Sequence, residues 1–235
     1  MIFDPLYILV ILVGMGLSLW ASTITKSRFR TYSQYTTRSR MTGAEVARSI
    51  LSDNGISDVR VERVAGELSD HYDPRTKTLR LSQAVHDSNT MAAFGVAAHE
   101  VGHAIQHAQS YAPLQFRSAW VPVANLGGGI SMVVIMLAFF MGGAASATGT
   151  SLSWLGVILF SGTTIFTLIT LPVEFDASKR ALACLRKGGY VIDKELDGAR
   201  KVLNAAAMTY VAAFVTSLLT LLYWAYRLGL MGGRR

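Results

Sequence analysis

Charged side chains are scarce in this sequence. They make up only 16% of the 235 residues, whereas they make up about a quarter of an ordinary soluble domain. Three stretches lack Asp, Glu, Lys, Arg and His altogether, and they cover residues 5–25, 118–173 and 202–226. The charge therefore lies in the remaining residues, at a density normal for a water-facing domain. This division excludes a protein that is soluble throughout and predicts one that is partly embedded in a bilayer.

The uncharged stretches have room for four membrane-spanning helices, because one helix needs about 20 apolar residues to cross the hydrocarbon core. The first and last stretches supply one span each, and the long central stretch supplies two. A small, uncharged segment at residues 142–151 is the expected turn between the central pair. We predict spans near residues 5–24, 121–143, 153–172 and 206–226.

The distribution of basic residues indicates the orientation. Asp4 is the only charged residue before the first span, and five basic residues lie between positions 26 and 40; this order is typical of an uncleaved anchor rather than a signal peptide. Seven basic residues lie in residues 174–201, and none separates the central spans. The positive-inside rule therefore places residues 26–117 and 174–201 in the cytoplasm, against the opposing effect of three arginines after the last span.

Cysteine is almost absent. The single cysteine, Cys184, excludes an internal disulfide and agrees with a reducing compartment. The net charge of +7 could suggest nucleic acid, but the basic residues lie beside the spans, where orientation and anionic head groups account for them. We expect a multi-pass protein of the cytoplasmic membrane, with the lipid bilayer and no nucleic acid among its partners.

Residues 26–117 have the pattern of an α+β domain. A capping box at Thr42 and Glu45 begins an amphipathic helix, and Gly55 is placed to end it. A second helix is expected from about residue 88 to about residue 109. Between the helices come three short alternating runs, of which the last two are separated by an Asp-Pro turn and should form a hairpin; they cover residues 59–64, 68–72 and 76–81.

The second of these helices contains the sequence His99-Glu-Val-Gly-His103. Histidines four residues apart on a helix lie one turn apart on the same side, so both rings can reach one ion. Glu100 is then free to hold a metal-bound water. This is the H-E-x-x-H arrangement of zinc peptidases, in which the carboxylate acts as general base. The sequence therefore predicts a zinc site with His99 and His103 as ligands and Glu100 as catalytic base.

A catalytic zinc needs a third protein ligand, and we favour Glu174. Two spans after the motif, the chain returns to the same side of the membrane, and Glu174 lies directly after the second of them. An acidic residue at this place is costly unless it has a partner. Pro172 is expected in the first turn of a new helical segment, which Gly188 and Gly189 would end.

Three other residues are weaker alternatives for the third ligand. His107 is one further turn along the same helix, and His71 lies in the expected hairpin. Asp197 lies in a Leu-Asp-Gly sequence like that of site-2-type intramembrane proteases, but those proteases place H-E-x-x-H inside a span, whereas the apolar run before His99 is too short.

The residues His99-Glu-Val-Gly-His-Ala-Ile-Gln106 and Glu174-Phe-Asp-Ala-Ser178 together resemble the YugP-type membrane zinc metallopeptidases over nearly the whole chain. That family is similar in plan to the HtpX and CAAX-prenyl endopeptidases, which are gluzincins with a glutamate as third ligand on a later helix. The resemblance implies an α+β zincin-like (gluzincin) domain with about four transmembrane helices. In these relatives the third-ligand motif is E-x-x-x-D, and here position 178 is Ser while the nearest acid is Asp176.

These observations lead to one main hypothesis, a zinc endopeptidase that cleaves peptide or protein substrates at the cytoplasmic membrane surface. Orienting partners for the histidines are expected at Asp176 or Ser178. The alternatives are a membrane scaffold with a structural zinc and an intramembrane protease that uses Asp197. The expected segments are an anchor (1–25), a catalytic domain (26–117), two spans (118–173), a returning loop or helix with the third ligand (174–205) and a last span with its tail (206–235).

Overall fold

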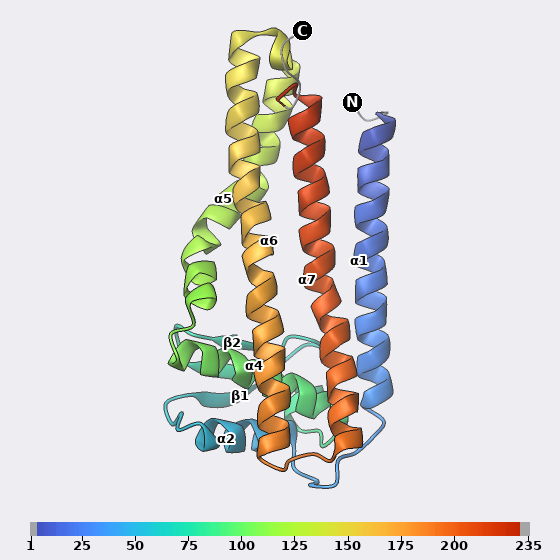
Figure 1. The fold of residues 1–235 in the computed structure, drawn as a ribbon, viewed down its shortest axis with the longest axis vertical. Coiled ribbons are helices and arrows are strands. Elements are labelled where there is room, and N and C mark those ends of the chain that lie inside the picture. Colours follow the sequence, from blue (N-terminus) through green and yellow to red (C-terminus); the bar gives the residue numbers. More distant parts are fainter. Residues whose placement is uncertain (1–3, 231–235) are drawn as a thin grey trace. The chain divides into compact units, whose positions relative to one another are not determined.

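The computed structural model describes residues 4–230 and is mostly helical (Figure 1). Its elements in chain order are α1 (Pro5–Tyr32), α2 (Gly43–Asp53), β1 (Arg60–Val64), β2 (His71–Asp73), β3 (Thr78–Ser82), α3 (Gln83–His86), α4 (Met91–Ala108), α5 (Ala112–Phe140), the 3-10 turn η1 (Gly143–Ala145), α6 (Ala147–Lys187) and α7 (Asp193–Arg227).

Four of the described helices, α1, α5, α6 and α7, are long and apolar enough to cross a membrane. The four predicted spans fall almost wholly within them, but α6 and α7 extend well beyond the predicted ends. The expectation that Pro172 begins a new helix is wrong, because α6 is one continuous helix with Pro172 inside it. Proline removes one backbone donor from a helix, and in long membrane helices neighbouring groups satisfy the freed carbonyl.

Contacts divide the chain into two units. The first unit holds the residues up to Trp20, Phe116–Leu171 and the residues from Tyr210 onward; the second unit holds Ala21–Gln115 and Pro172–Thr209. The boundaries cut through the long helices, so each long helix contributes to both units. Neither unit corresponds to a single continuous segment of the chain.

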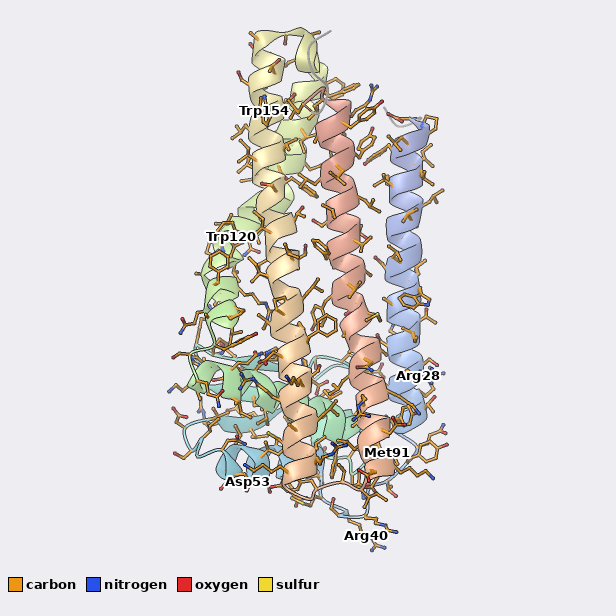
Figure 2. All side chains as sticks on the ribbon, viewed as in Figure 1. Arg28, Arg40, Asp53, Met91, Trp120 and Trp154 are labelled. Carbon is orange, nitrogen blue, oxygen red and sulfur yellow. The ribbon has the colours of Figure 1, made fainter. Side chains whose placement is uncertain are left out.

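The first unit is a set of apolar helical segments joined by aromatic and hydroxyl contacts. Trp224 is fully buried, and Trp120 donates a hydrogen bond of 2.9 Å to the carbonyl of Gly162. By contrast, Trp154 projects from α6 (Figure 2) and is 50% exposed. Large exposed apolar side chains are unusual on a soluble surface, and on these segments they suit contact with lipid.

The second unit contains a three-stranded sheet with the order β1-β3-β2. Strands β2 and β3 are antiparallel, which confirms the predicted hairpin, whereas β1 runs parallel to β3. Because β3 lies in the centre, its residues Leu79 and Leu81 are fully buried. They join a core that α2, α3, α4, α6 and α7 complete, with Val46, Ile50, Val85, Phe94, Val101, Leu185 and Leu203 among its members.

Both predicted helices of the second unit are present. At the start of α2 the Thr42 side chain accepts from the backbone N–H of Glu45, and the Glu45 carboxylate accepts from the backbone N–H of Thr42 at 2.7 Å. Gly55 follows the helix with a φ of +69°, which only glycine adopts freely. Helix α4 begins after Thr90, whose hydroxyl accepts from the N–H of Ala93. These caps account for where the two helices begin and where α2 ends.

Candidate metal centre

Helix α4 carries the H-E-x-x-H sequence through the core of the second unit. It is buried on most sides, because alanines such as Ala93, Ala97 and Ala98 leave room for neighbouring elements to approach closely. The side chains of His99 and His103 are only 13% and 11% exposed.

The approach of α6 to α4 is made possible by a glycine. A Cβ atom at Gly102 would lie 2.5 Å from the backbone oxygen of Ala177, so no larger residue fits there without a shift. This contact lies within the second unit and is between Glu174 and Ser178 along α6. Glu174 and Ser178, which are one turn apart on α6 and flank Ala177, both lie within hydrogen-bond distance of His99 of α4.

The side chains of His99, His103 and Glu174 converge. The Oε2 atom of Glu174 lies 3.2 Å from Nε2 of His99 and 3.4 Å from Nε2 of His103. One ligand atom from each residue lies within 4.8 Å of the others, and among the described residues this is the one group of three or more that could hold a metal ion. Two imidazole nitrogens and a carboxylate oxygen are a donor set that suits zinc.

The other ring nitrogen of each histidine has its own hydrogen-bond partner. The Nδ1 atom of His99 lies 3.1 Å from the hydroxyl of Ser178 on α6. The Nδ1 atom of His103 lies 3.0 Å from Oε1 of Gln106, one turn along α4. Metal-binding histidines commonly use one nitrogen for the ion and the other for such a partner, so the Nε2 atoms are the ones that face the metal position.

The electrostatics of the site favour a positive charge. Glu174 and Glu100 are 3% and 8% exposed. Burial raises the pKa of the Glu100 carboxyl above its ordinary value, although the charges of His99 and His103 oppose this. Burial would lower the pKa of the His103 imidazole, but its hydrogen bond to Glu174 and the nearby carboxylates raise it. A cation, either a proton or a metal ion, is therefore stabilised between these groups.

The three residues considered as alternative third ligands make contacts with other groups and are not part of this cluster. His71 is exposed and its ring hydrogen-bonds to the carbonyl of Ser69. His107 lies 2.8 Å from the hydroxyl of Tyr72. Asp197 is about half exposed and pairs with Lys201 at 2.6 Å.

The two expected orienting residues occupy different places. Ser178 contacts a histidine directly, whereas Asp176 accepts a hydrogen bond of 2.8 Å from the amide of Gln106 and reaches His103 only through it. Gln106 and Gly102 were not identified from the sequence as site residues. Gln106 lies three residues after His103, so its place on the same helix face could have been noticed, but its partners on α6 could not.

Residues 7–229 match the model of a family described as "Putative neutral zinc metallopeptidase". The chain is 45% identical over 217 residues to the "Putative membrane protease YugP" of Bacillus subtilis (strain 168), with 92% of this chain and 94% of that protein covered. No solved structure matched. Together with the His99, His103 and Glu174 cluster, these matches give the protein zinc as its cofactor and show that the chain belongs to this family of neutral zinc metallopeptidases.

Proposed function

We propose that the protein is a membrane-embedded zinc endopeptidase whose catalytic domain is of the zincin-like, gluzincin α+β type. The observation that carries this proposal is the convergence of His99, His103 and Glu174 from helices α4 and α6, which are about 75 residues apart in sequence. A helix with H-E-x-x-H beside a sheet, with a glutamate from a later helix, is the arrangement that the resemblance implied. The four membrane-length helices then hold this domain at the bilayer.

The zinc ligands in this proposal are Nε2 of His99, Nε2 of His103 and the carboxylate of Glu174. Catalytic zinc sites typically have three protein ligands, whereas structural zinc sites have four, so these three residues would suit a catalytic zinc. When bound, zinc supplies Lewis acidity, which lowers the pKa of a water and polarises the scissile carbonyl. Ser178 orients His99, and Gln106, held by Asp176, orients His103.

Glu100 is the general base. Its carboxylate is buried on the same helix, next to His99. It accepts a proton from the attacking water and passes it to the amine that leaves when the peptide bond breaks. Because this carboxyl group is buried, the proton that it holds during the reaction is shielded from bulk water.

A peptide substrate is proposed to bind in extended form along the sheet. Strand β2 is at an edge of the sheet, so one side of its backbone has no strand partner within residues 4–230. It also lies next to α4, since the hydroxyl of Tyr72 hydrogen-bonds to His107. Addition of a strand to such an edge is a common mode of peptide recognition.

The catalytic residues are proposed to act on the cytoplasmic side of the cell membrane. The basic residues of the segments 26–117 and 174–201 support this orientation by the positive-inside rule. Arg28 and Arg40, which project outward from these segments (Figure 2), are among them. An intramembrane protease that uses Asp197 is disfavoured, because Asp197 is paired with Lys201. A structural zinc is disfavoured by the three-ligand cluster.

The test compares the wild-type protein with Glu100→Gln, both purified at full length in detergent and loaded with zinc. The substrate is an unfolded, membrane-tethered polypeptide. We expect Glu100→Gln to bind zinc with wild-type stoichiometry and to lose cleavage by at least about 100-fold, since a general base contributes on the order of 10²–10⁴ to the rate. Equal cleavage by both proteins would refute the proposed mechanism.

A further inference from the structure

Gln106 is a fully buried polar residue that the catalytic scheme needs only as a neighbour of His103. All the hydrogen-bonding groups of its side chain that the structure records are in use. Its Nε2 atom donates to the backbone carbonyl of Val173 and to Oδ2 of Asp176, both at 2.8 Å, and its Oε1 atom faces Nδ1 of His103 at 3.0 Å. A buried amide satisfied on both ends has one stable orientation.

The identity of these partners determines that orientation. A carbonyl oxygen and a carboxylate oxygen can only accept hydrogen bonds, so they require the NH₂ end of the amide. If the amide were flipped, its oxygen would lie against two acceptors in a buried place. Oε1 therefore points to His103 and requires a donor from it, which must be the Nδ1–H of the ring. In the neutral form of the ring, which is the form that binds a metal, the Nε2 atom of His103 then carries the lone pair and faces the metal position.

His99 is not constrained in this way. Its Nδ1 atom faces the hydroxyl of Ser178, and a hydroxyl can either donate or accept. The Ser178 contact is compatible with both tautomers of His99, whereas the Gln106 contact is compatible with one tautomer of His103. The contacts of the two rings therefore select one tautomer of His103 but leave both tautomers open to His99.

Asp176, which accepts a hydrogen bond from Gln106, is itself held in place by further contacts. Asp176 forms an ion pair with Arg180 one turn along α6, and Arg180 donates to the side chain of Gln109 and lies over the ring of Tyr111 at 5.5 Å. Gln109 and Tyr111 follow the end of α4. The acceptor that holds Gln106 is therefore fixed to both helices that supply zinc ligands.

We propose that Gln106 is a positioning residue that selects the metal-binding tautomer of His103, and that Asp176 and Arg180 fix its amide in the required orientation. This inference rests on the proposed zinc site. Loss of an orienting partner typically weakens a metal site by 10- to 100-fold. Gln106 is fully buried and hydrogen-bonds to the ring of His103, so we expect its effect to reach the reaction through the geometry of His103.

The test uses the full-length protein in detergent and the ions Zn²⁺ and Co²⁺ alone. Gln106→Met keeps the approximate size of the side chain and removes its hydrogen bonds, and Gln115→Met makes the same change at an exposed position of α5. We expect Gln106→Met to bind Zn²⁺ about 10- to 100-fold more weakly, with a faster release of the ion and an altered visible spectrum of the Co²⁺ form. Gln115→Met should match the wild type. At saturating Zn²⁺, Gln106→Met should lower kcat and leave KM for a peptide unchanged.

Wild-type Zn²⁺ affinity and an unchanged Co²⁺ spectrum in folded Gln106→Met would overturn the proposal. If that variant does not fold, Asp176→Ala decides, because it removes one of the two acceptors that orient the amide. Its Zn²⁺ affinity should then fall by a smaller factor, and wild-type affinity would overturn the proposal. His103→Ala distinguishes a failure of the proposed zinc site from a failure of the positioning role of Gln106. If it retains Zn²⁺, the proposed site itself fails; if it loses Zn²⁺ while Gln106→Met keeps wild-type affinity, only the positioning role fails.

Discussion

Gly102 of α4 and Ala177 of α6 are in backbone contact, because a Cβ atom at position 102 would lie 2.5 Å from the oxygen of Ala177. The Gly102→Ala substitution therefore forces the two helices apart. We expect it to lower the free energy of unfolding by about 1–3 kcal/mol, as overpacking does. It should also weaken zinc binding, because Glu174 moves away from the histidines. Denaturant unfolding and zinc titration of the full-length protein measure both effects.

The matched control for this change is Gly128→Ala in α5. A Cβ atom at Gly128 would meet no atom within 4 Å beyond its chain neighbours and the backbone of its own helix, and alanine favours a helix over glycine by up to about 1 kcal/mol. Gly128→Ala should leave zinc binding unchanged and stability equal or slightly higher. If Gly102→Ala behaves like Gly128→Ala in both measurements, close helix contact is not what assembles the site.

Ser178 provides a second prediction. Its hydroxyl lies 3.1 Å from Nδ1 of His99, and relatives with the E-x-x-x-D motif have an aspartate at the corresponding position. We expect Ser178→Ala to weaken zinc binding by about 10-fold through a less ordered His99 ring, and Ser178→Asp to retain or increase the affinity. Isothermal titration with Zn²⁺ provides the comparison. An unchanged affinity in Ser178→Ala would show that this contact does not orient the ring.

The pairing of His99 with His103 could be predicted from sequence because it depends only on helical spacing, which is a local property. The hairpin and the two caps are local in the same sense. The closeness of Glu174 to the histidines could be predicted because two predicted spans return the chain to the side of the membrane on which the motif is expected. The continuity of α6 through Pro172 could not be predicted, since it depends on whether neighbouring groups compensate for a missing backbone donor.

The contacts of Gln106 could not be predicted from the sequence, for a different reason. A glutamine after an H-E-x-x-H motif gives no sign of burial, and its partners Val173 and Asp176 are about 70 residues away. Their distance from Gln106 depends on the helix separation that Gly102 permits. The start of α7 at Asp193, before the apolar stretch begins, was missed because hydropathy locates the apolar part of a helix but not its polar end.

The turn between β2 and β3 gives a pH-dependent prediction. Asp73 accepts hydrogen bonds from the hydroxyl of Thr76 at 2.9 Å and from the N–H of Arg75 at 3.0 Å, and these bonds lower the pKa of its carboxyl to about 2. A carboxyl whose pKa is lowered in the folded state stabilises the fold above its unfolded pKa. That stabilisation is lost progressively as the pH falls from about 5 to about 1, through the folded pKa.

We therefore expect Asp73→Asn to be less stable than the wild type by about 1 kcal/mol at pH 6, the usual contribution of a hydrogen bond. The difference should shrink below pH 4, be much reduced at pH 2 and disappear near pH 1. Unfolding of the metal-free proteins in detergent at a series of pH values measures it, and the absence of metal removes the titration of the zinc site from the comparison. A difference that does not change with pH would contradict this account.

The most direct test of the zinc site is the metal content of two purified full-length variants, Glu174→Ala and Asp197→Ala. Glu174 contacts both histidines, whereas Asp197 pairs with Lys201. We predict one zinc per chain in the wild type and in Asp197→Ala, and little or none in Glu174→Ala after dialysis against a weak chelator. Retention of zinc by Glu174→Ala, with its loss from Asp197→Ala, would contradict the assembly of the site from α4 and α6.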